Sequence, residues 1–283
     1  MRLAVLGMGQ MGRAFAARAL DRGHDVTVWN RSPGRGTELI AGGAAEAESP
    51  AAAATDADVV LVVLADDSAV IDVCLGQHGA LAALGPAAVL ANVSTVAPET
   101  VLRLAGAGPA GRVLDAPVMG SPAAISGGYG RFLIGGPIAA IEAAGPLWDD
   151  LGAGYVHCGP VGTGATMKII SNLLLITSVA ALAEGIATAR LHHIPDELLR
   201  TLFAGSPVVS LATQLRLESI LDGSHPGWFA PALARKDLRL AIDLADQVGV
   251  RARVGPAVDE LLTAVIDAGG DWPDFSAVIE ALT

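Results

Sequence analysis

The sequence predicts an α/β protein with two domains: a doubly wound parallel sheet with helices on both faces, followed by an all-helical domain. In residues 1–162, apolar runs of strand length alternate with helical patterns, which is typical of a parallel sheet. In residues 163–283 the strand signals stop and helical patterns follow one another. The composition, 52% hydrophobic and 17% charged, fits a compact globular protein.

The first domain has closely spaced elements. It begins with a predicted strand at 2–7, a helix at 11–23, a second strand at 24–30 and a helix at 50–56. The continuous apolar run at 57–64 predicts a strand that is buried on both faces. The later elements are predicted as a helix at 68–75, a strand at 87–95, a helix from residue 98, and strands at 111–118 and 131–136.

The second domain begins with a helix at 167–193 that is apolar nearly all round and must be buried among other helices. Its uncharged run, Ile169 to Ala183, is shorter than the roughly 20 residues that span a bilayer, so we expect no membrane segment. A homodimer that buries the excess apolar surface is expected. Further helices are predicted at 196–204, 208–221, 230–248, 255–268 and 274–282.

The charge balance excludes some partners. A net charge of -11 would repel nucleic acid and anionic membranes, so an anionic ligand needs a local site. Cys74 and Cys158 lie in apolar stretches without metal-ligand spacing and are expected to be buried, reduced thiols. The chain begins with a strand pattern and not with a signal sequence, so we expect a cytoplasmic protein.

A glycine-rich motif, G-x-G-x-x-G, lies between the first strand and the first helix. Its context is that of a Rossmann dinucleotide-binding unit, since a second strand follows at the expected distance. Gly7 would make the tight turn, Gly9 would let the pyrophosphate approach, and Gly12 would allow close helix packing. The predicted cofactor-binding residues of this motif are Gly7, Met8, Gly9, Gln10, Met11 and Gly12.

The end of the second strand indicates which dinucleotide is bound. It reads Trp29-Asn30-Arg31-Ser32, without the carboxylate that holds the ribose 2′-hydroxyl of NAD. Arg31 can hold a 2′-phosphate with its planar set of donors, and Asn30 and Ser32 can add hydrogen bonds. These residues favour NADP(H) as the cofactor. Leu64 and Ala65 end the fourth strand, where the strand order should reverse and a ribose is expected.

Several motifs together resemble the β-hydroxyacid dehydrogenase family, which includes 3-hydroxyisobutyrate dehydrogenase and the glyoxylate and succinic semialdehyde reductases. The resemblance covers nearly the whole chain. Its carriers are LGMGQMG, VLADD ending at Asp67, STV at Ser94 to Val96, DAPVMGS at Asp115 to Ser121, GxGxxxKxxxN at Gly162 to Asn172, KDLRLA at Lys236 to Ala241, and PDFSAVIEAL near the C-terminus. It implies an oxidoreductase that transfers a hydride between the nicotinamide and a small aldehyde, oxo acid or hydroxy acid.

The resemblance implies that Lys168 is the catalytic lysine and Asn172 its companion. The two are four residues apart, so one helix face presents both to one substrate oxygen. The lysine would pass a proton to the carbonyl oxygen during reduction and accept it in the reverse direction. The further residues that the resemblance implies are Gly120 and Ser121 for the substrate carboxylate, Thr95 beside the nicotinamide, Lys236 at the cofactor, and Phe229 and Asp237 lining the site.

The substrate loop departs from this family at Met119, where a hydroxyl donor is usual, so the pocket would be drier. The same stretch resembles the imine reductases, which carry a Met, a Pro and an Ile where this chain has Met119, Pro122 and Ile125. Reduction of an apolar imine is therefore the alternative. Lys168 and the KDL motif favour the β-hydroxyacid dehydrogenase hypothesis over imine reduction.

Two other possibilities belong to different classes. A nucleotide-binding regulatory module without turnover would keep the glycine motif, but the presence of Lys168 and Asn172 speaks against it. A metal centre has little support, because the adjacent His192 and His193 have no carboxylate set at ligand spacing. The expected partners are a small-molecule substrate and a second copy of the chain.

Overall fold

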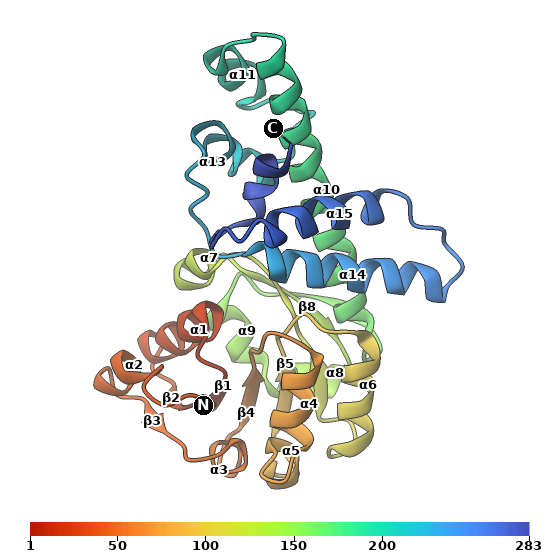
Figure 1. The fold of residues 1–283 in the computed structure, drawn as a ribbon. Coiled ribbons are helices and arrows are strands. Elements are labelled where there is room, and N and C mark those ends of the chain that lie inside the picture. Colours follow the sequence, from red (N-terminus) through yellow and green to blue (C-terminus); the bar gives the residue numbers. More distant parts are fainter. Residues whose placement is uncertain (283) are drawn as a thin grey trace. The chain divides into compact units, whose positions relative to one another are not determined.

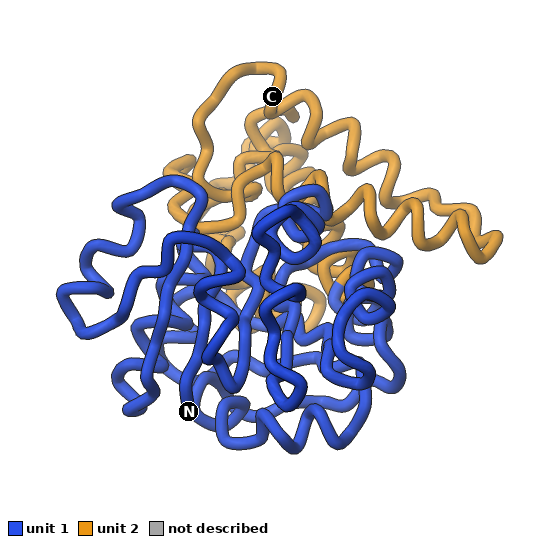
Figure 2. Tube along the Cα trace, turned by 90° about the horizontal axis from the view of Figure 1, so that it is seen from below, with its two compact units in different colours: residues 1–168 blue, residues 169–283 orange. Residues whose placement is uncertain are grey.

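The computed structural model describes residues 1–282, and the chain forms two compact units (Figures 1 and 2). The N-terminal unit is Met1–Lys168 and the C-terminal unit is Ile169–Thr283. One long helix, α10 (Thr163–Leu191), begins in the first unit and continues in the second. The sequence placed the domain boundary near the start of this helix.

The N-terminal unit contains a nine-stranded sheet in the order β3-β2-β1-β4-β5-β6-β8-β7, with β9 beside β8. Strands β1 to β6 run parallel, and the strand order reverses between β1 and β4, as in a Rossmann fold. The strands are β1 (Arg2–Leu6), β2 (Asp25–Trp29), β3 (Ala45–Glu46), β4 (Val59–Val62), β5 (Val89–Asn92), β6 (Val113–Asp115), β7 (Val118–Met119), β8 (Arg131–Gly135) and β9 (Tyr155–Gly159).

Helices cover both faces of this sheet, so it is doubly wound (Figure 1). Leu3 and Val5 of β1 belong to one hydrophobic cluster, and Ala4 and Leu6 belong to another on the opposite face. This alternation explains why the strand is apolar throughout. The helices are α1 (Gln10–Asp21), α2 (Thr37–Ala41), α3 (Pro50–Ala54), α4 (Asp67–Leu75), α5 (Ala80–Ala83), α6 (Pro98–Ala107), α7 (Pro122–Gly127), α8 (Ile138–Ala143) and α9 (Gly145–Leu151).

The far side of the sheet differs from the expected parallel pattern. Strand β8 runs antiparallel to β6 and β7, and β9, which was not predicted, pairs with it in parallel. A short apolar run does not show the direction of its strand. Strand β9 escaped prediction because Tyr155 and Val156 are about half exposed, so it has no apolar pattern. Of the two cysteines expected to be buried, Cys158 on this strand is only half-buried. Cys74 is buried, and burial raises the pKa of its thiol to about 12.

The C-terminal unit is all-helical around one hydrophobic cluster. Ile176 and Val179 of α10 pack there with Leu238 of α14 and Leu262 of α15. The predicted helix at 208–221 is in fact two helices, broken at Arg216, whose guanidinium pairs with the buried Asp274 at 2.8 Å. The elements are α11 (Asp196–Phe203), α12 (Leu211–Gln214), α13 (Leu217–Asp222), α14 (Pro231–Gln247), α15 (Val254–Asp267) and a 3-10 helix, η1 (Phe275–Ala281).

Helix α10 is longer than the uncharged run from which we expected no membrane segment. It has 29 residues and is long and apolar enough to cross a membrane by length and composition, because the helix extends beyond the uncharged run. Ile176, Val179 and Ile186 are nevertheless buried in the core of the C-terminal unit. The helix is not buried on all sides, since Leu174 is 63% exposed.

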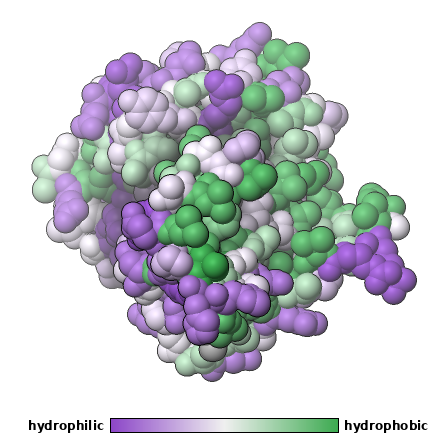
Figure 3. Space-filling model, turned by 90° about the horizontal axis from the view of Figure 1, so that it is seen from above, coloured by the Kyte–Doolittle hydropathy of each residue, from purple (hydrophilic) through white to green (hydrophobic). Residues whose placement is uncertain are grey.

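Other large apolar side chains of the C-terminal unit are also exposed, and hydrophobic residues gather on the face drawn in Figure 3. Those on α11 to α13 and the loops between them are Leu198, Leu202, Val208, Leu211 and Leu215. Soluble monomers rarely expose contiguous apolar surface of large area. Such exposure is typical of a surface that is covered by a partner, as in the expected homodimer.

Candidate active site

The glycine-rich turn joins the end of β1 to the first turn of α1. Gly7 has a φ of +107°, which glycine adopts without strain, and a Cβ there would collide with the carbonyl oxygen of Val63. A Cβ on Gly12 would collide with the carbonyl oxygen of Gly7, whereas one on Gly9 would meet no atom within 4 Å. The turn is closed at Gly7 and Gly12 and open at Gly9, which fits a pyrophosphate over the backbone at the helix N-terminus.

Asn30 ties the end of β2 to this turn. Its amide oxygen accepts a hydrogen bond from the backbone N–H of Met8 at 2.9 Å, and its amide nitrogen donates to the carbonyl oxygen of Ser32 at 2.9 Å. These bonds use one acceptor site and one N–H of the amide, so its task in the structure is to hold the turn. One N–H of the amide is left for a ligand.

Arg31 follows Asn30 in the loop after β2, and Arg35 lies close behind it. Both guanidinium groups are exposed, and neither makes a hydrogen bond or an ion pair within residues 1–282. Ser32 is also exposed, as is Gln10 at the start of α1, while Met8 is buried beneath the turn. The loop therefore presents two uncommitted cations at the end of β2.

The loops after β4 and β5 are bonded to each other. The backbone N–H of Leu64 donates to Oγ of Ser94 at 2.9 Å. Asp67 also joins them, since its carboxylate accepts from the N–H of Ala97 at 2.9 Å and from the hydroxyl of Thr100 at 2.6 Å. In the sequence Asp67 stands out only as part of a motif, because a bond across 30 residues leaves no local pattern.

These bonds position three predicted cofactor residues. Leu64 and Ala65 follow β4, and Thr95 follows β5, so all three lie at the carboxyl ends of neighbouring parallel strands. Strand β4 is also next to β1, at the point where the strand order reverses. Ligands of doubly wound sheets bind at this edge, at this reversal.

The predicted substrate loop connects β7 to α7. Gly120 has a φ of +155°, and a Cβ there would lie 3.2 Å from Cα of Gly130. Oγ of Ser121 accepts a hydrogen bond from the N–H of Ala124 at 3.1 Å and so caps α7, while its hydroxyl hydrogen can still be donated to a ligand. Met119 is 46% exposed and offers only a thioether to its surroundings.

Lys168 and Asn172 lie one turn apart on α10. Asn172 is buried, and its amide nitrogen donates to a carboxylate oxygen of Asp237 at 2.6 Å. The other oxygen of Asp237 lies 2.7 Å from the ammonium of its neighbour Lys236 on α14. The structure thus connects three of the predicted residues within the C-terminal unit.

Phe229, by contrast, is a core residue in the structure. Only 7% of it is exposed, and its ring packs 5.2 Å from that of Phe275 and 5.6 Å from that of Trp228. Its carbonyl oxygen also accepts a hydrogen bond from the N–H of Phe275 at 2.8 Å. Its place in the site therefore stays an implication of the resemblance, and the structure gives it a packing role.

Two family models match consecutive parts of the chain. The NAD binding domain of 6-phosphogluconate dehydrogenase matches residues 2–159, and the NAD-binding domain of NADP-dependent 3-hydroxyisobutyrate dehydrogenase matches residues 162–282. Glyoxylate/succinic semialdehyde reductase 1 of Arabidopsis thaliana is 32% identical over 100% of this chain and 98% of the reductase. The chain belongs to the β-hydroxyacid dehydrogenase family.

Solved structures of this and related families have the same fold. A 3-hydroxyisobutyrate dehydrogenase of Mycobacterium tuberculosis, solved with L-serine, matches with a TM-score of 0.86 at 26% identity, over 99% of this chain and 98% of that one. A Streptomyces aurantiacus imine reductase matches with a TM-score of 0.64 at 26% identity, over 100% of both chains. As a β-hydroxyacid dehydrogenase, the chain is an oxidoreductase with a nicotinamide-dinucleotide domain.

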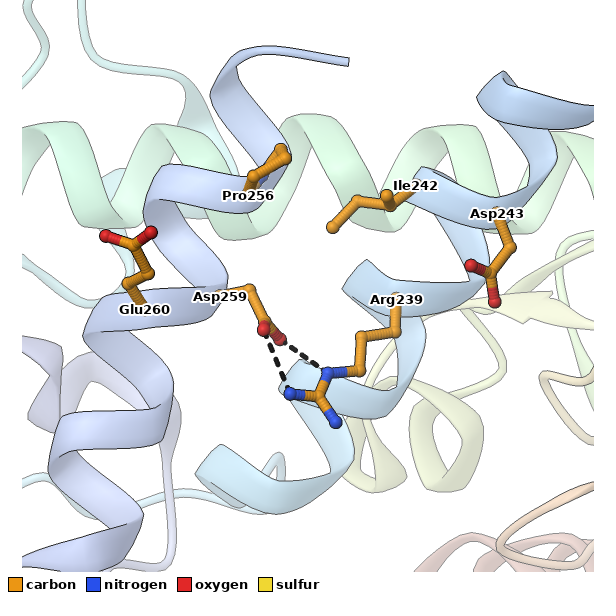
Figure 4. Close-up of a pocket in the computed structure, with 6 residues that line it drawn as sticks. All are labelled: Arg239, Ile242, Asp243, Pro256, Asp259 and Glu260. Atoms are coloured by element: carbon orange, nitrogen blue, oxygen red, sulfur yellow. Dashed lines mark hydrogen bonds and ion pairs between the residues drawn. The ribbon is translucent and has the colours of Figure 1, made fainter. Parts of the chain in front are cut away.

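An open cleft of about 430 Å³ lies between α14 and α15 of this β-hydroxyacid dehydrogenase (Figure 4). Arg239 and Asp259 are joined across it by two hydrogen bonds of 2.8 and 3.0 Å. None of its lining residues was predicted to bind cofactor or substrate. Over the described part of the chain, residues 1–282, no group of three or more His, Cys, Asp or Glu side chains is arranged to hold a metal ion.

Proposed function

We propose that this chain is an NADP(H)-dependent enzyme that interconverts small aldehydes or oxo acids and their hydroxy acids, with Lys168 as general acid and base. The observation that carries the proposal is the arrangement on α10, where Lys168 precedes by one turn an Asn172 whose amide is held by Asp237. A lysine and a fixed amide on one helix face can hold one substrate oxygen between them.

The use of lysine in the sequence supports this role. Lys168 and Lys236 are its only lysines, while arginine supplies the rest of the 18 basic side chains. Arginine stays protonated in proteins, whereas a lysine ammonium can give up its proton. One of the two lysines thus lies where the proposal needs a group that can give up a proton.

The cofactor site favours the phosphorylated dinucleotide. The open backbone at Gly9 would hold the pyrophosphate, and Arg31 would bind the 2′-phosphate through paired hydrogen bonds. The absence of a carboxylate directly after β2 in the sequence removes the usual partner of an NAD ribose. When bound, the nicotinamide would give or take the hydride.

The residues of the chain would transfer the proton and bind the substrate carboxylate. In reduction, the Lys168 ammonium hydrogen-bonds the carbonyl oxygen and transfers a proton to it while the carbonyl carbon accepts the hydride. In oxidation, neutral Lys168 accepts the hydroxyl proton. The Ser121 hydroxyl and the Gly120 N–H would bind the substrate carboxylate, since the Ser121 hydrogen is not used in capping α7.

The test is NADPH consumption with glyoxylate and succinic semialdehyde, for the wild type and Lys168→Ala. We expect the variant to lose about 10²- to 10⁴-fold in kcat, which is the usual contribution of a general acid. Lys168→Arg is the comparison for the proton, because it keeps the positive charge at this position with a group that does not give up its proton. Equal rates for the wild type and Lys168→Ala would contradict the lysine mechanism. NADPH binding without any turnover would favour a regulatory module.

A second candidate, imine reduction, is favoured by Met119. The exposed thioether supplies no donor for a carboxylate and suits an apolar substrate. A panel of cyclic imines with NADPH would test this activity, with Met119→Ser as the comparison. If the imine reading is correct, the serine variant loses imine turnover and gains activity on oxo acids. No turnover of any imine would count against it.

We further propose that the protein is a homodimer, supported by the apolar side chains that the C-terminal unit exposes. We also propose a cytoplasmic location, supported by the free thiols of Cys74 and Cys158. Light scattering at micromolar concentration tests the dimer, and a monomer would contradict it. With a net charge of -11, binding to nucleic acid or to anionic membranes is not expected.

A further inference from the structure

Asp115, the last residue of β6, has a buried carboxylate that binds the start of α10. One oxygen accepts a hydrogen bond from the backbone N–H of Gly162 at 2.8 Å, and the other accepts one from Ala165 at 2.7 Å. The first amides of a helix have no partners within it, and an anion at this end interacts favourably with the helix dipole. The carboxylate therefore fixes the beginning of α10 to the end of a central strand.

Two glycines make room for this carboxylate. A Cβ on Gly164 would lie 2.9 Å from Oδ2 of Asp115 and would collide with the carbonyl oxygen of Leu133. A Cβ on Gly135 would lie 2.5 Å from Oδ1. Neither position can take a side chain unless the carboxylate or the helix moves. The Asp115 motif and the glycines before Lys168, although distant in sequence, thus form one packed unit.

A carboxylate at this position has an energetic cost. Burial raises the pKa of Asp115 above its usual range, although the N–H groups of Gly162 and Ala165 act in the opposite direction. A serine, a threonine or an asparagine caps a helix without burying a charge. Costly buried charges are concentrated where a site needs them, which points to a task for this one.

We propose that Asp115 is a positioning residue for Lys168. The lysine lies three residues after Ala165, so the carboxylate fixes the turn from which the lysine side chain extends. The same segment continues from Asp115 to Gly120 and Ser121, which would bind the substrate carboxylate. It thereby connects α10, which carries the proposed general acid Lys168, to the substrate loop. The inference rests on the proposed function, because positioning matters only if Lys168 transfers the proton.

The first test is Asp115→Asn, which keeps the size of the side chain but places an amide N–H against a backbone N–H. We expect kcat with glyoxylate to fall by about 10- to 100-fold, as for a misplaced catalytic group. The Kd of NADPH should stay unchanged, because the glycine turn and Arg31 belong to other elements. Labelling with [13Cε]lysine gives two NMR signals, from Lys168 and Lys236. The Lys168 signal should shift or broaden while that of Lys236 stays in place.

The matched control is Asp150→Asn. Asp150 is a partly buried aspartate of the same unit that bonds to Arg22 and His24, neither of which is a predicted site residue. It should leave kcat and the Lys168 signal unchanged. If Asp115→Asn does not fold, as judged by circular dichroism, Gly164→Ala displaces the first turn of α10 while the carboxylate remains, and it should give the same kinetic and NMR changes.

Two results would overturn the inference: a wild-type kcat and Lys168 signal in folded Asp115→Asn, or a parallel loss of kcat and NADPH affinity, which indicates general disruption. Lys168→Ala is measured alongside. If it keeps full activity, the proposed function fails, while the Lys168 signal in Asp115→Asn still reports whether the carboxylate positions the lysine.

Discussion

The amide of Asn172 and the carboxylate of Asp237 are bonded to each other at 2.6 Å, and both side chains are buried. The bond connects α10 to α14 beside the apolar core of the C-terminal unit. Because the amide nitrogen of Asn172 faces Asp237, its oxygen is the atom that can accept a further hydrogen bond. Asn172 is thus oriented to serve a donor, such as an ammonium or a hydroxyl group, and not a carboxylate.

Asn172→Asp should destabilise the protein in a pH-dependent way. The new carboxylate would lie at hydrogen-bond distance from that of Asp237, with the one ammonium of Lys236 beside two negative charges, so the folded pair holds a proton more tightly than the unfolded chain does. The free energy of unfolding should therefore be closest to the wild type near pH 5 and fall further below it toward pH 8. Urea unfolding at both pH values measures this. Asn172→Ala is the control and should lose about 1–3 kcal/mol at either pH. A pH-independent loss in Asn172→Asp would contradict the expectation.

Gly9→Ala and Gly12→Ala should have opposite effects on folding and binding. A Cβ on Gly12 collides with the carbonyl oxygen of Gly7, so Gly12→Ala should lower the melting temperature strongly or prevent folding. A Cβ on Gly9 meets no atom within 4 Å, so Gly9→Ala should fold normally but bind NADPH weakly, because the methyl group lies where the pyrophosphate approaches. Thermal unfolding and fluorescence titration measure the two effects. Normal NADPH affinity in Gly9→Ala would place the pyrophosphate elsewhere.

The sequence predicted those parts of the fold in which burial produces a regular pattern. Strand β4 is apolar because both of its faces are covered, and its pattern is visible in one continuous run. Strand β9 is half exposed and β3 has only two residues, so neither produces such a run. Arg216 lies at the break between α12 and α13 and pairs with Asp274, a residue far along the chain, so this contact leaves no local pattern.

The candidate site divides in the same way. The glycine turn could be predicted because local backbone atoms leave no room for a side chain at Gly7 and Gly12. Asn172 could be predicted because helical spacing places it on the same face as Lys168. The bonds of Asp67 and Asp115 could not be predicted, because they depend on which loops meet after folding. The bond between the Asn30 amide and the turn was not predicted either, and the hydrogen bond of Asn30 to the cofactor stays a prediction.

Arg31→Ala should weaken NADPH binding selectively. Losing the hydrogen bonds between a guanidinium and a phosphate should raise the Kd of NADPH by about 10- to 100-fold, the equivalent of roughly 1.5–3 kcal/mol. The affinity for NADH should not change, because NADH has no 2′-phosphate. Fluorescence titration with both dinucleotides measures the ratio, and Arg35→Ala shows whether the second exposed arginine shares the task. Equal losses for NADPH and NADH would show that Arg31 acts on the loop and not on the phosphate.

The buried carboxyl of Asp115 should also make stability depend on pH. Burial raises its pKa in the folded protein, so the folded state holds the proton more tightly than the unfolded chain does. The resulting stabilisation is fully present below about pH 4, the ordinary range of aspartate, and is lost as the pH rises through the folded pKa. Asp115→Asn cannot titrate, so the unfolding free energy of the wild type relative to this variant should fall from pH 4 toward neutrality and then level off. Urea unfolding followed by tryptophan fluorescence measures the difference. A difference that grows with pH would mean that the backbone N–H groups outweigh burial and hold the carboxylate ionised.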